Sequence, residues 1–417
     1  MRVRNRDGRH GMGGTVDMGG MAGGVHGHCD ARFARVREVF EKHFADGEEV
    51  GASFAVFHRG RVVVDLWGGL ADHRAGREWE RDTPAFVYSC TKAVTAAAVL
   101  LLAEDGVLDL TAPVASVWPE FEARGKAGIT VEHLLTHQAG LPVIEDEVPL
   151  EEFDDLPAVA ARLAGQAPLW TPGAAHGYHA LTYGFLLEEV VRRAAGCSVA
   201  DMVADRIAGP LGLELWLGAP DEVAAHAARL TAGDRANDRV NDRVNDRAND
   251  GAGARVDARA NAVSADGLLS RALGNPPIHR LKGGANHPLM LRAGWPAAGV
   301  VATARGLAGF YRALVEDALL EPSTLVDATG SRVRGHDRVL QVETAFGLGF
   351  MLPSAAYPAP PRARRSAFGH LGYGGALGMG DAVHGLGMAY IMNRMSHEVV
   401  GNVRAYRLVE AVYDSLP

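Results

Sequence analysis

The sequence predicts an α/β fold in which one domain is built from both ends of the chain and a mostly helical subdomain is inserted between them. Three observations support this prediction. β-rich runs lie at 51–69, helical periodicity dominates the middle of the chain, and Gly-punctuated apolar runs return after about residue 295. We expect the α/β domain at residues 30–84 and 291–417, and the helical subdomain at 85–290.

The bulk composition is that of a globular protein and excludes several functional classes. Of the 417 residues, 47% are hydrophobic and 22% are charged. The formal net charge of −8 provides no basic field, so we expect no nucleic-acid partner. The longest apolar stretch, residues 93–103, is too short to span a bilayer, and no signal-like apolar run follows the N-terminus. We therefore expect a cytoplasmic protein with no membrane partner.

Two segments are not expected to join a core. Residues 1–29 are rich in Gly, Met and His and show no helical or strand period, which predicts a disordered tail. The histidines of this tail and Cys29 are interpreted as incidental, since nothing fixes a metal-binding geometry. A low-complexity insert is predicted at 233–262, because the repeat DRAN-DRVN-DRVN-DRAN-D at 234–250 cannot bury apolar surface.

The first elements follow from local patterns. Apolar residues recur at helical spacing over 32–45, and two β-rich runs flank His58-Arg59-Gly60, which indicates a hairpin. Residues 89–105 form a helix that is apolar on every face and should be buried, with Gly106 as its stop. Later helices are expected at 131–136, 157–165, 182–195, 199–207 and 401–414, and later strands at 346–352, 366–372 and 386–393.

The strongest chemical signal is Ser89-Cys90-Thr91-Lys92, an S-x-x-K motif. Residues i and i+3 of a helix share one face, so Lys92 could accept a proton from the Ser89 hydroxyl. At the helix start, the Ser89 N–H would also be free to hold an oxyanion. Only four of the 42 basic residues are lysines, and an arginine in place of Lys92 would stay protonated.

A purely structural interpretation of this motif also exists: Ser89 as an N-cap followed by an incidental surface lysine. The apolar helix argues against it, because a lysine on a buried helix needs a partner or a chemical role. Cys90 should point about 100° away from Ser89, and we interpret it as a packing residue.

Three other motifs are better explained by structure than by chemistry. Gly196-Cys197-Ser198-Val199-Ala200 nearly spells a nucleophile elbow, but it follows a helix, so we expect Gly196 to end that helix and Ser198 to cap the next. His133 and His137 lack a third ligand, so no metal site is predicted. The glycines of GYGGALGMG do not have dinucleotide-binding spacing.

Several segments, in the expected order, resemble the serine β-lactamase and penicillin-binding-protein superfamily. The resemblance is to its class C-like branch, which includes the family VIII carboxylesterases, and it covers roughly residues 30–230 and 290–415. It implies an antiparallel sheet flanked by helices, with Ser89 as the acylated nucleophile and Lys92 as its partner. The segments are VVVDLWGGLAD, SCTKAVTAAAVLLL, ITVEHLLTHQAGLP, TPGAAHGYHALTYG, FGLGF, FGHLGYGG and AYIMNRM.

The second element of this family is Y-x-N, and Tyr178-His179-Ala180 occupies its place, with alanine where the family has asparagine. By this resemblance, Tyr178 shares protons with Lys92 and Ser89, with its pKa lowered by the nearby cation. From the residues alone, Tyr178 is as easily a core tyrosine, and Tyr88 or Tyr183 would serve equally well.

The third element is K-T-G, and its place is taken by His370-Leu371-Gly372. The resemblance implies that Gly372 lets substrate approach closely, and that the N–H of Tyr373 is a second oxyanion donor. His370 could polarise a carboxylate or carbonyl, or be structural. Histidine is mostly neutral near pH 7, whereas the family's lysine is charged. Ala180 also lacks the side-chain amide with which the family's asparagine contacts the substrate in β-lactamases. Small neutral esters are therefore favoured over penicillins.

The sequence therefore predicts a serine hydrolase that cleaves small carboxylic esters through an acyl-enzyme on Ser89, with no metal or organic cofactor. A β-lactamase, a D-amino-acid peptidase and an acyltransferase of the same fold are alternatives within this chemistry. A non-catalytic binding or scaffolding protein is an alternative of another class. The physiological substrate and the oligomeric state have no signal in the sequence.

Overall fold

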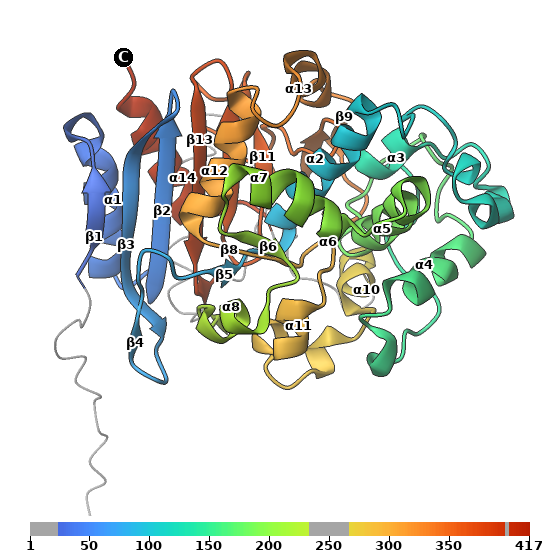
Figure 1. Cartoon of the computed structure of the whole chain (residues 1–417), viewed down its shortest axis with the longest axis horizontal. Helices are drawn as coiled ribbons and strands as arrows, with labels where there is room; N and C mark the ends of the chain where they lie inside the picture. The colour runs from blue at the N-terminus through green and yellow to red at the C-terminus, as the bar shows by residue number, and fades with distance from the viewer. Residues whose placement is uncertain (1–23, 233–266, 397–399) are drawn as a thin grey trace, which may run out of the picture.

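The computed structural model describes residues 24–232, 267–396 and 400–417. Its centre is a seven-stranded antiparallel sheet in the order β1-β3-β2-β13-β12-β11, with β4 paired to β3 (Figure 1). Strands from both ends of the chain meet in this sheet, so the predicted fold class is confirmed. The strands are β1 (His26–Cys29), β2 (Gly51–His58), β3 (Arg61–Asp72), β4 (Arg77–Glu78), β11 (Ala367–Leu371), β12 (Leu377–Asp381) and β13 (Leu386–Met392).

The sheet is assembled by one local turn and one long-range pairing. Arg59 and Gly60, both with positive φ, form the two-residue turn of the predicted β2–β3 hairpin. β13 then pairs over its whole length with residues 52–58 of β2, with Phe54 opposite Tyr390. This pairing joins segments more than 300 residues apart and places the C-terminal strands beside the N-terminal hairpin.

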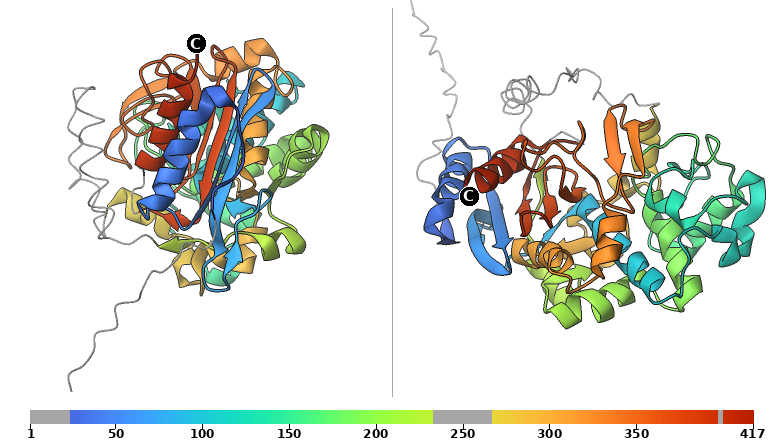
Figure 2. Two further views of the ribbon diagram at one scale, coloured as in Figure 1. Left: turned by 90° about the vertical axis from the view of Figure 1, so that its left-hand side faces the viewer. Right: turned by 90° about the horizontal axis from the view of Figure 1, so that it is seen from above.

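Helices cover both faces of the sheet. On one face α1 (Ala34–Ala45) packs beside the C-terminal α14 (Val403–Asp414), as Figure 2 shows in its left view. On the other face α12 (Ala304–Val315) packs against β2, β12 and β13. The predicted terminal helices at 32–45 and 401–414 are thus confirmed, and each buries its apolar side on the sheet.

Most of the remaining helices lie to the right of α12 in Figure 1, and α8 lies below it. Among them α2 (Thr91–Glu104) is buried on every face from Thr91 to Leu102, as its apolar sequence predicts. No helix in the described ranges has the length and apolarity needed to cross a membrane. The others are α3 (Val131–Leu135), α4 (Leu156–Gly165), α5 (Thr182–Ala195), α6 (Val199–Met202), α7 (Gly209–Leu211), α8 (Asp221–His226), α10 (Leu268–Gly274), α11 (Pro288–Arg292) and α13 (Pro322–Ala328).

Three small sheets connect these helices to the centre. β5 (Ala85–Phe86) and β6 (Leu215–Leu217) pair with β8 (Val300–Ala302). β9 (Val333–His336) and β10 (Glu343–Phe346) form a hairpin, and β7 (Thr231–Ala232) runs parallel to β14 (Arg394–Met395). β5 delivers the chain to the start of α2, where Ser89 lies.

Three sequence predictions are wrong in detail. Residues 26–29, placed in the disordered tail, form β1, because their backbone pairs with β3. The strand expected at 346–352 ends at Phe346, because the chain turns back through Gly349 at φ 81°. The helix expected at 199–207 is regular only to Met202 and continues as a π-helix, Val203–Ala208. Residues 1–23 and the insert at 233–262 lie outside the described residues.

Candidate active site

One cavity brings together most of the residues that the sequence singles out. It has a volume of about 310 Å³ and lies where the turn before α2, β11, the segment before α5 and the α10–α11 segment meet. Ser89, Tyr178, His370 and Tyr373 all line it. The other lining residues are Phe86, Tyr88, Ala180, Leu181, Leu269, Leu273, Ile278, His279, Gly284, Ala285, Met290, Trp295, Ala298, Leu340, Met351, Leu371 and Val400.

Ser89 lies in a short 3₁₀ turn, Tyr88–Cys90, that runs directly into α2. Tyr88 has φ 48°, a conformation that costs free energy for a residue with a bulky side chain. The Tyr88 carbonyl accepts a hydrogen bond of 2.6 Å from the Thr91 hydroxyl, which holds this turn in place. Because Ser89 is in the first turn of the helix, its N–H has no acceptor within the helix. The strained backbone at Tyr88 thus presents Ser89 to the cavity.

Lys92 is fully buried directly behind Ser89. Its Nζ lies 3.1 Å from Ser89 Oγ and donates hydrogen bonds to the carbonyls of Ala180 (2.8 Å) and Ala297 (3.0 Å). Burial lowers the pKa of Lys92 well below its ordinary value of 10.5, because a charged amine loses its hydration there. The geometry therefore favours a neutral amine next to a hydroxyl.

Tyr178 also lines the cavity and lies next to Lys92. Its ring centre lies 4.7 Å from Lys92 Nζ. Burial raises the pKa of Tyr178 above its ordinary value, and a hydrogen bond with Ser89 opposes that shift only in part. The expectation that a neighbouring cation lowers this pKa is wrong, because Lys92 is itself held neutral by burial. Tyr178 is therefore a protonated phenol at neutral pH and can donate a proton.

Asp337, which the sequence analysis missed, positions Tyr178. Its buried Oδ1 accepts hydrogen bonds from the backbone N–H of Tyr178 (3.0 Å), Val339 (2.8 Å) and Leu340 (2.8 Å). Oδ2 accepts a further bond from the Thr344 hydroxyl at 3.2 Å. The only local signal is an Asp at the start of a turn, which bonds N–H groups two and three residues on. Its contact with Tyr178 spans 159 residues and leaves no sequence pattern.

A buried histidine cluster also supports the Tyr178 ring. The rings of His137 and Tyr178 lie 5.0 Å apart, and His137 Nδ1 accepts a 3.1 Å bond from the His179 N–H. His133, four residues earlier, closes a capping box with Thr130 at the start of α3, so its role is structural. In the described ranges, no three His, Cys, Asp or Glu side chains are grouped so that they could hold a metal ion.

His370 lies on β11, lines the same cavity as Ser89 and is 2% exposed. Its Nδ1 lies 2.7 Å from the Leu371 carbonyl, which can only accept, so this nitrogen carries the proton. Burial lowers the pKa of His370 to about 3, because a charged imidazole would lose its hydration there. The ring is therefore neutral, and its Nε2, which has no partner among the described residues, is an acceptor.

The two residues that follow β11 have different surroundings. A Cβ on Gly372 would lie 2.3 Å from the Val87 carbonyl, and Gly372 is not among the cavity-lining residues. The missing side chain of Gly372 thus makes room for the backbone before Ser89, whereas we expected it to make room for the substrate. Tyr373 lines the cavity mouth at 37% exposure, and its ring packs edge-on against Tyr88 at 5.6 Å. Gly372 therefore lets the end of β11 pack close to the Ser89 turn.

The remaining candidate residues have structural surroundings. Cys90 is buried, its Sγ lies 3.3 Å from the His370 carbonyl oxygen, and it is not among the cavity-lining residues, which agrees with its interpretation as a packing residue. Gly196 ends α5 in the left-handed conformation, and Ser198 caps α6 through the Asp201 N–H. The near-elbow at 196–200 is thus a junction between two helices.

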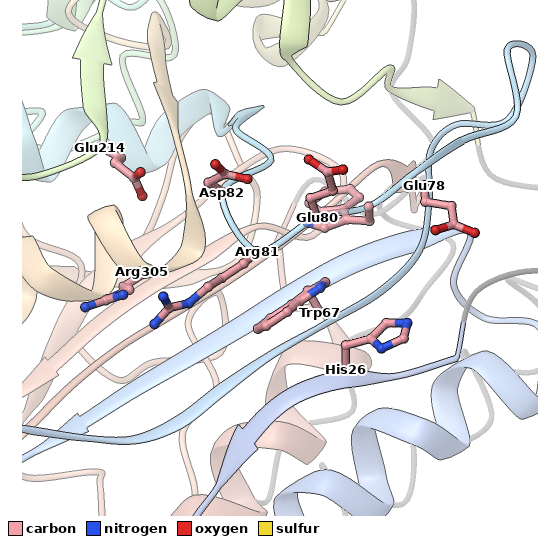
Figure 3. A pocket seen from close by; sticks show the side chains of 9 residues that line it. His26, Trp67, Glu78, Glu80, Arg81, Asp82, Glu214 and Arg305 are labelled. Atoms are coloured by element: carbon pink, nitrogen blue, oxygen red, sulfur yellow. The ribbon is translucent and has the colours of Figure 1, made fainter.

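A second, larger cavity of about 540 Å³ contains none of the predicted site residues. Figure 3 shows the carboxylates of Glu214, Asp82 and Glu80 along one side of it and two arginines, Trp67 and His26 along the other. One of these arginines, Arg81, is paired with Asp65 at 2.7 Å. This cavity is separate from the Ser89 site.

Comparison with known proteins agrees with this geometry. The Beta-lactamase family model matches residues 36–413. The chain belongs to the Beta-lactamase family. It is 31% identical over 412 residues to "Esterase/beta-lactamase LipL" of Mycobacterium tuberculosis, covering 92% of this chain and 88% of that protein. The predicted superfamily is thereby confirmed.

Two solved structures are similar over nearly the whole chain. A family VIII carboxylesterase shares 33% identity with a TM-score of 0.81, covering 94% of this chain and 100% of that one. A penicillin-binding-protein homologue from Caulobacter crescentus shares 37% identity with a TM-score of 0.80 and the same coverage. These likenesses support the prediction of a carboxylesterase-like, β-lactamase-related serine hydrolase.

Proposed function

We propose that this protein is a carboxylesterase that cleaves small neutral esters through an acyl-enzyme on Ser89. The observation that carries this proposal is the 3.1 Å contact between Ser89 Oγ and a buried Lys92 Nζ beside an apolar cavity. A neutral amine at this distance can take the hydroxyl proton as Oγ attacks a carbonyl carbon. The names of the relatives, esterase and carboxylesterase, point the same way.

In the first step, the Ser89 proton moves to Lys92 Nζ while Oγ bonds to the ester carbonyl carbon. The negative charge on the carbonyl oxygen is held by the backbone N–H groups of Ser89 and Tyr373. As the tetrahedral intermediate collapses, the alcohol leaves with a proton from the Tyr178 phenol. The proton on Lys92 then restores the phenol, and the acyl group remains on Ser89.

In the second step, a water molecule attacks the acyl carbon and gives up its proton to the same pair of residues. The acid leaves, and Ser89 recovers its hydroxyl proton. One ester and one water thus give one acid and one alcohol. Every proton is carried by a residue of this chain, so the proposed route needs no metal or organic cofactor.

The charges around the cavity favour esters over β-lactams. None of the described lining residues is Lys, Arg, Asp or Glu, so the carboxylate of a penicillin has no cationic partner there. His370 is neutral and presents an acceptor, which repels a carboxylate oxygen instead of binding it. β-Lactamase, D-amino-acid peptidase and acyltransferase activities remain as measurable alternatives for the same nucleophile.

Two serine variants test this proposal. Ser89→Ala should abolish turnover of p-nitrophenyl butyrate while leaving the fold intact. Ser198→Ala removes only a helix cap, so it should keep turnover and lose about 1 kcal/mol of stability. Intact-mass labelling with a fluorophosphonate should add one adduct to the parent and none to Ser89→Ala. Turnover by Ser89→Ala would reject the assignment, an unlabelled parent would indicate a binding protein, and faster nitrocefin than ester turnover would indicate a β-lactamase.

A further inference from the structure

One continuous segment, residues 268–291, forms a wall of the Ser89 cavity. It carries α10, two short 3₁₀ turns (Ile278–Arg280 and Gly284–Asn286) and α11. We call this segment the α10–α11 wall. Its apolar side chains in the cavity are Leu269, Leu273, Ile278, Ala285 and Met290, and Trp295 follows directly after it.

The α10–α11 wall is fixed in place by two asparagines. The Asn275 side chain donates to the carbonyls of Ile144 (2.9 Å) and Asp146 (2.8 Å) and accepts from the Val148 N–H (3.0 Å). Asn286 makes the same kind of paired contact with the backbone of Leu230, at 2.8 and 2.9 Å. In each asparagine, both the side-chain oxygen and the side-chain NH₂ group are hydrogen-bonded, so the two residues hold the wall at a defined distance from Ser89.

The polar and apolar groups of the cavity are separated. The groups that handle protons, Ser89, Tyr178 and His370, come from the 3₁₀ turn before α2, the segment before α5, and β11. The α10–α11 wall adds only His279 as a titratable side chain. A substrate whose carbonyl reaches Ser89 therefore places its attached chain against apolar side chains.

We propose that the α10–α11 wall is the subsite for the aliphatic acyl chain of the ester, and that Leu269 helps to set the accepted chain length. This inference rests on the proposed function and names its substrate class. We assign the wall to the acyl group of the ester and not to the alcohol, because the alcohol leaves after the first step. The acyl group stays bonded to Ser89 until the second step ends, so apolar contacts with it can favour both acylation and deacylation. A cavity of about 310 Å³ is at the small end for ligand sites, which points to short and medium chains.

Burial of each methylene on this wall is worth about fourfold in kcat/KM. For p-nitrophenyl esters, kcat/KM should thus rise from acetate through butyrate and fall once the chain exceeds the cavity. Leu269→Trp should lower the ratio of octanoate to butyrate turnover by about tenfold, and Leu269→Ala should raise it. Opposite shifts from two substitutions at one site are not produced by loss of stability.

Leu289 provides a matched control. It lies on α11 and is not among the cavity-lining residues. Its exposed fraction, 37%, equals that of Leu273, which does line the cavity. Leu289→Ala should leave the chain-length profile unchanged. Asn275→Ala removes the bonds to the 144–148 loop, so it should flatten the profile and raise KM for octanoate more than for acetate.

The measurement is kcat/KM over p-nitrophenyl acetate, butyrate, hexanoate and octanoate, together with alkyl acetates of increasing alcohol length. If both Leu269 variants keep the parental acyl profile, or if only the alcohol series responds, the inference is overturned. If the parent protein cleaves no ester and takes no fluorophosphonate, the proposed function itself fails. The two failures are therefore distinguishable.

Discussion

The Nζ of Lys92 lies 3.1 Å from Ser89 Oγ, one helical turn away, and its other two hydrogen bonds go to backbone carbonyls. A neutral amine has two N–H groups and one lone pair, so donation to both carbonyls leaves the lone pair for the Ser89 hydroxyl proton. Lys126 is a useful contrast within the chain. Its Nζ donates to the carbonyls of Ala123, Ala164 and Gln166, which requires three N–H groups and therefore a charged amine.

This contrast predicts how activity depends on pH and on Lys92. Because the pKa of Lys92 is well below 10.5, kcat/KM should rise with pH as Lys92 loses its proton and should already be near its plateau far below pH 10.5. Lys92→Arg keeps a charge that does not titrate, so it should lower kcat/KM by at least about 10²-fold. Lys126→Arg should retain the parental pH profile. A Lys92→Arg enzyme with near-parental rates would show that Lys92 is not the base.

Tyr178 and Tyr183 make a second matched pair. Both are buried beside Lys92, but the Tyr183 hydroxyl donates to the Lys92 carbonyl at 3.3 Å, whereas Tyr178 interacts with Ser89. Tyr178→Phe should lower kcat for p-nitrophenyl butyrate by about 10²–10⁴-fold, the range for loss of a proton donor. Tyr183→Phe should lose about 1 kcal/mol of stability and keep kcat. Equal effects of the two substitutions would contradict the role given to Tyr178.

Asp337 should act on the reaction through Tyr178. Asp337→Ala leaves three backbone N–H groups and the Thr344 hydroxyl without their acceptor, which should cost about 3 kcal/mol or more in unfolding free energy. Asp337→Asn keeps one acceptor oxygen and should cost less. In the folded Asp337→Asn variant, kcat should fall by a larger factor than KM changes. The reason is that the Tyr178 phenol moves, whereas the apolar wall that binds the substrate stays in place. Parental kcat in Asp337→Asn would limit Asp337 to a structural role.

The contrast between Lys92 and Asp337 shows which parts of the site are readable from sequence. Ser89 and Lys92 are three residues apart on one helix, so their contact follows from helical geometry. Tyr178 and His370 come from distant segments and could be proposed only through family resemblance. Asp337 contacts Tyr178 across 159 residues, and such a contact depends on a turn whose position no local pattern fixes.

The elements of the fold also divide into those that local sequence patterns predict and those that depend on tertiary packing. The helix at 89–105 and the hairpin at His58-Arg59-Gly60 were predictable because their patterns are local. β12 was not among the predicted strands, because two of its five residues, Gly378 and Gly380, are of a type that is depleted in strands. A Cβ on Gly378 would lie 2.3 Å from the Tyr311 ring, and one on Gly380 would lie 2.6 Å from the Phe368 ring. These glycines make room for aromatic rings on the sheet, which only the tertiary packing reveals.

A buried ion pair behind the Tyr373 turn also affects stability. Glu49 Oε2 lies 2.9 Å from Arg404 Nη1, and Glu49 also accepts a hydrogen bond from the Tyr390 hydroxyl. Arg404 donates in turn to the carbonyls of Gly374 and Arg394. Burial raises the pKa of Glu49 from 4.5 to about 7, and the opposing effect of Arg404 does not cancel this.

This raised pKa predicts a specific pH dependence of unfolding. Between pH 4.5 and 7 the folded state holds the Glu49 proton more tightly than the unfolded state, so stability from this group is present below pH 4.5 and is lost as pH rises through 7. The parent should therefore lose about 2–3 kcal/mol relative to Glu49→Gln between pH 5 and pH 8. Other titrating groups, including Glu188 and His43, are common to both proteins and largely cancel in this difference. Urea unfolding of both proteins at the two pH values measures this loss. If the parent loses no stability relative to Glu49→Gln between pH 5 and pH 8, Glu49 is already ionised in the folded protein at pH 5 and the prediction is wrong.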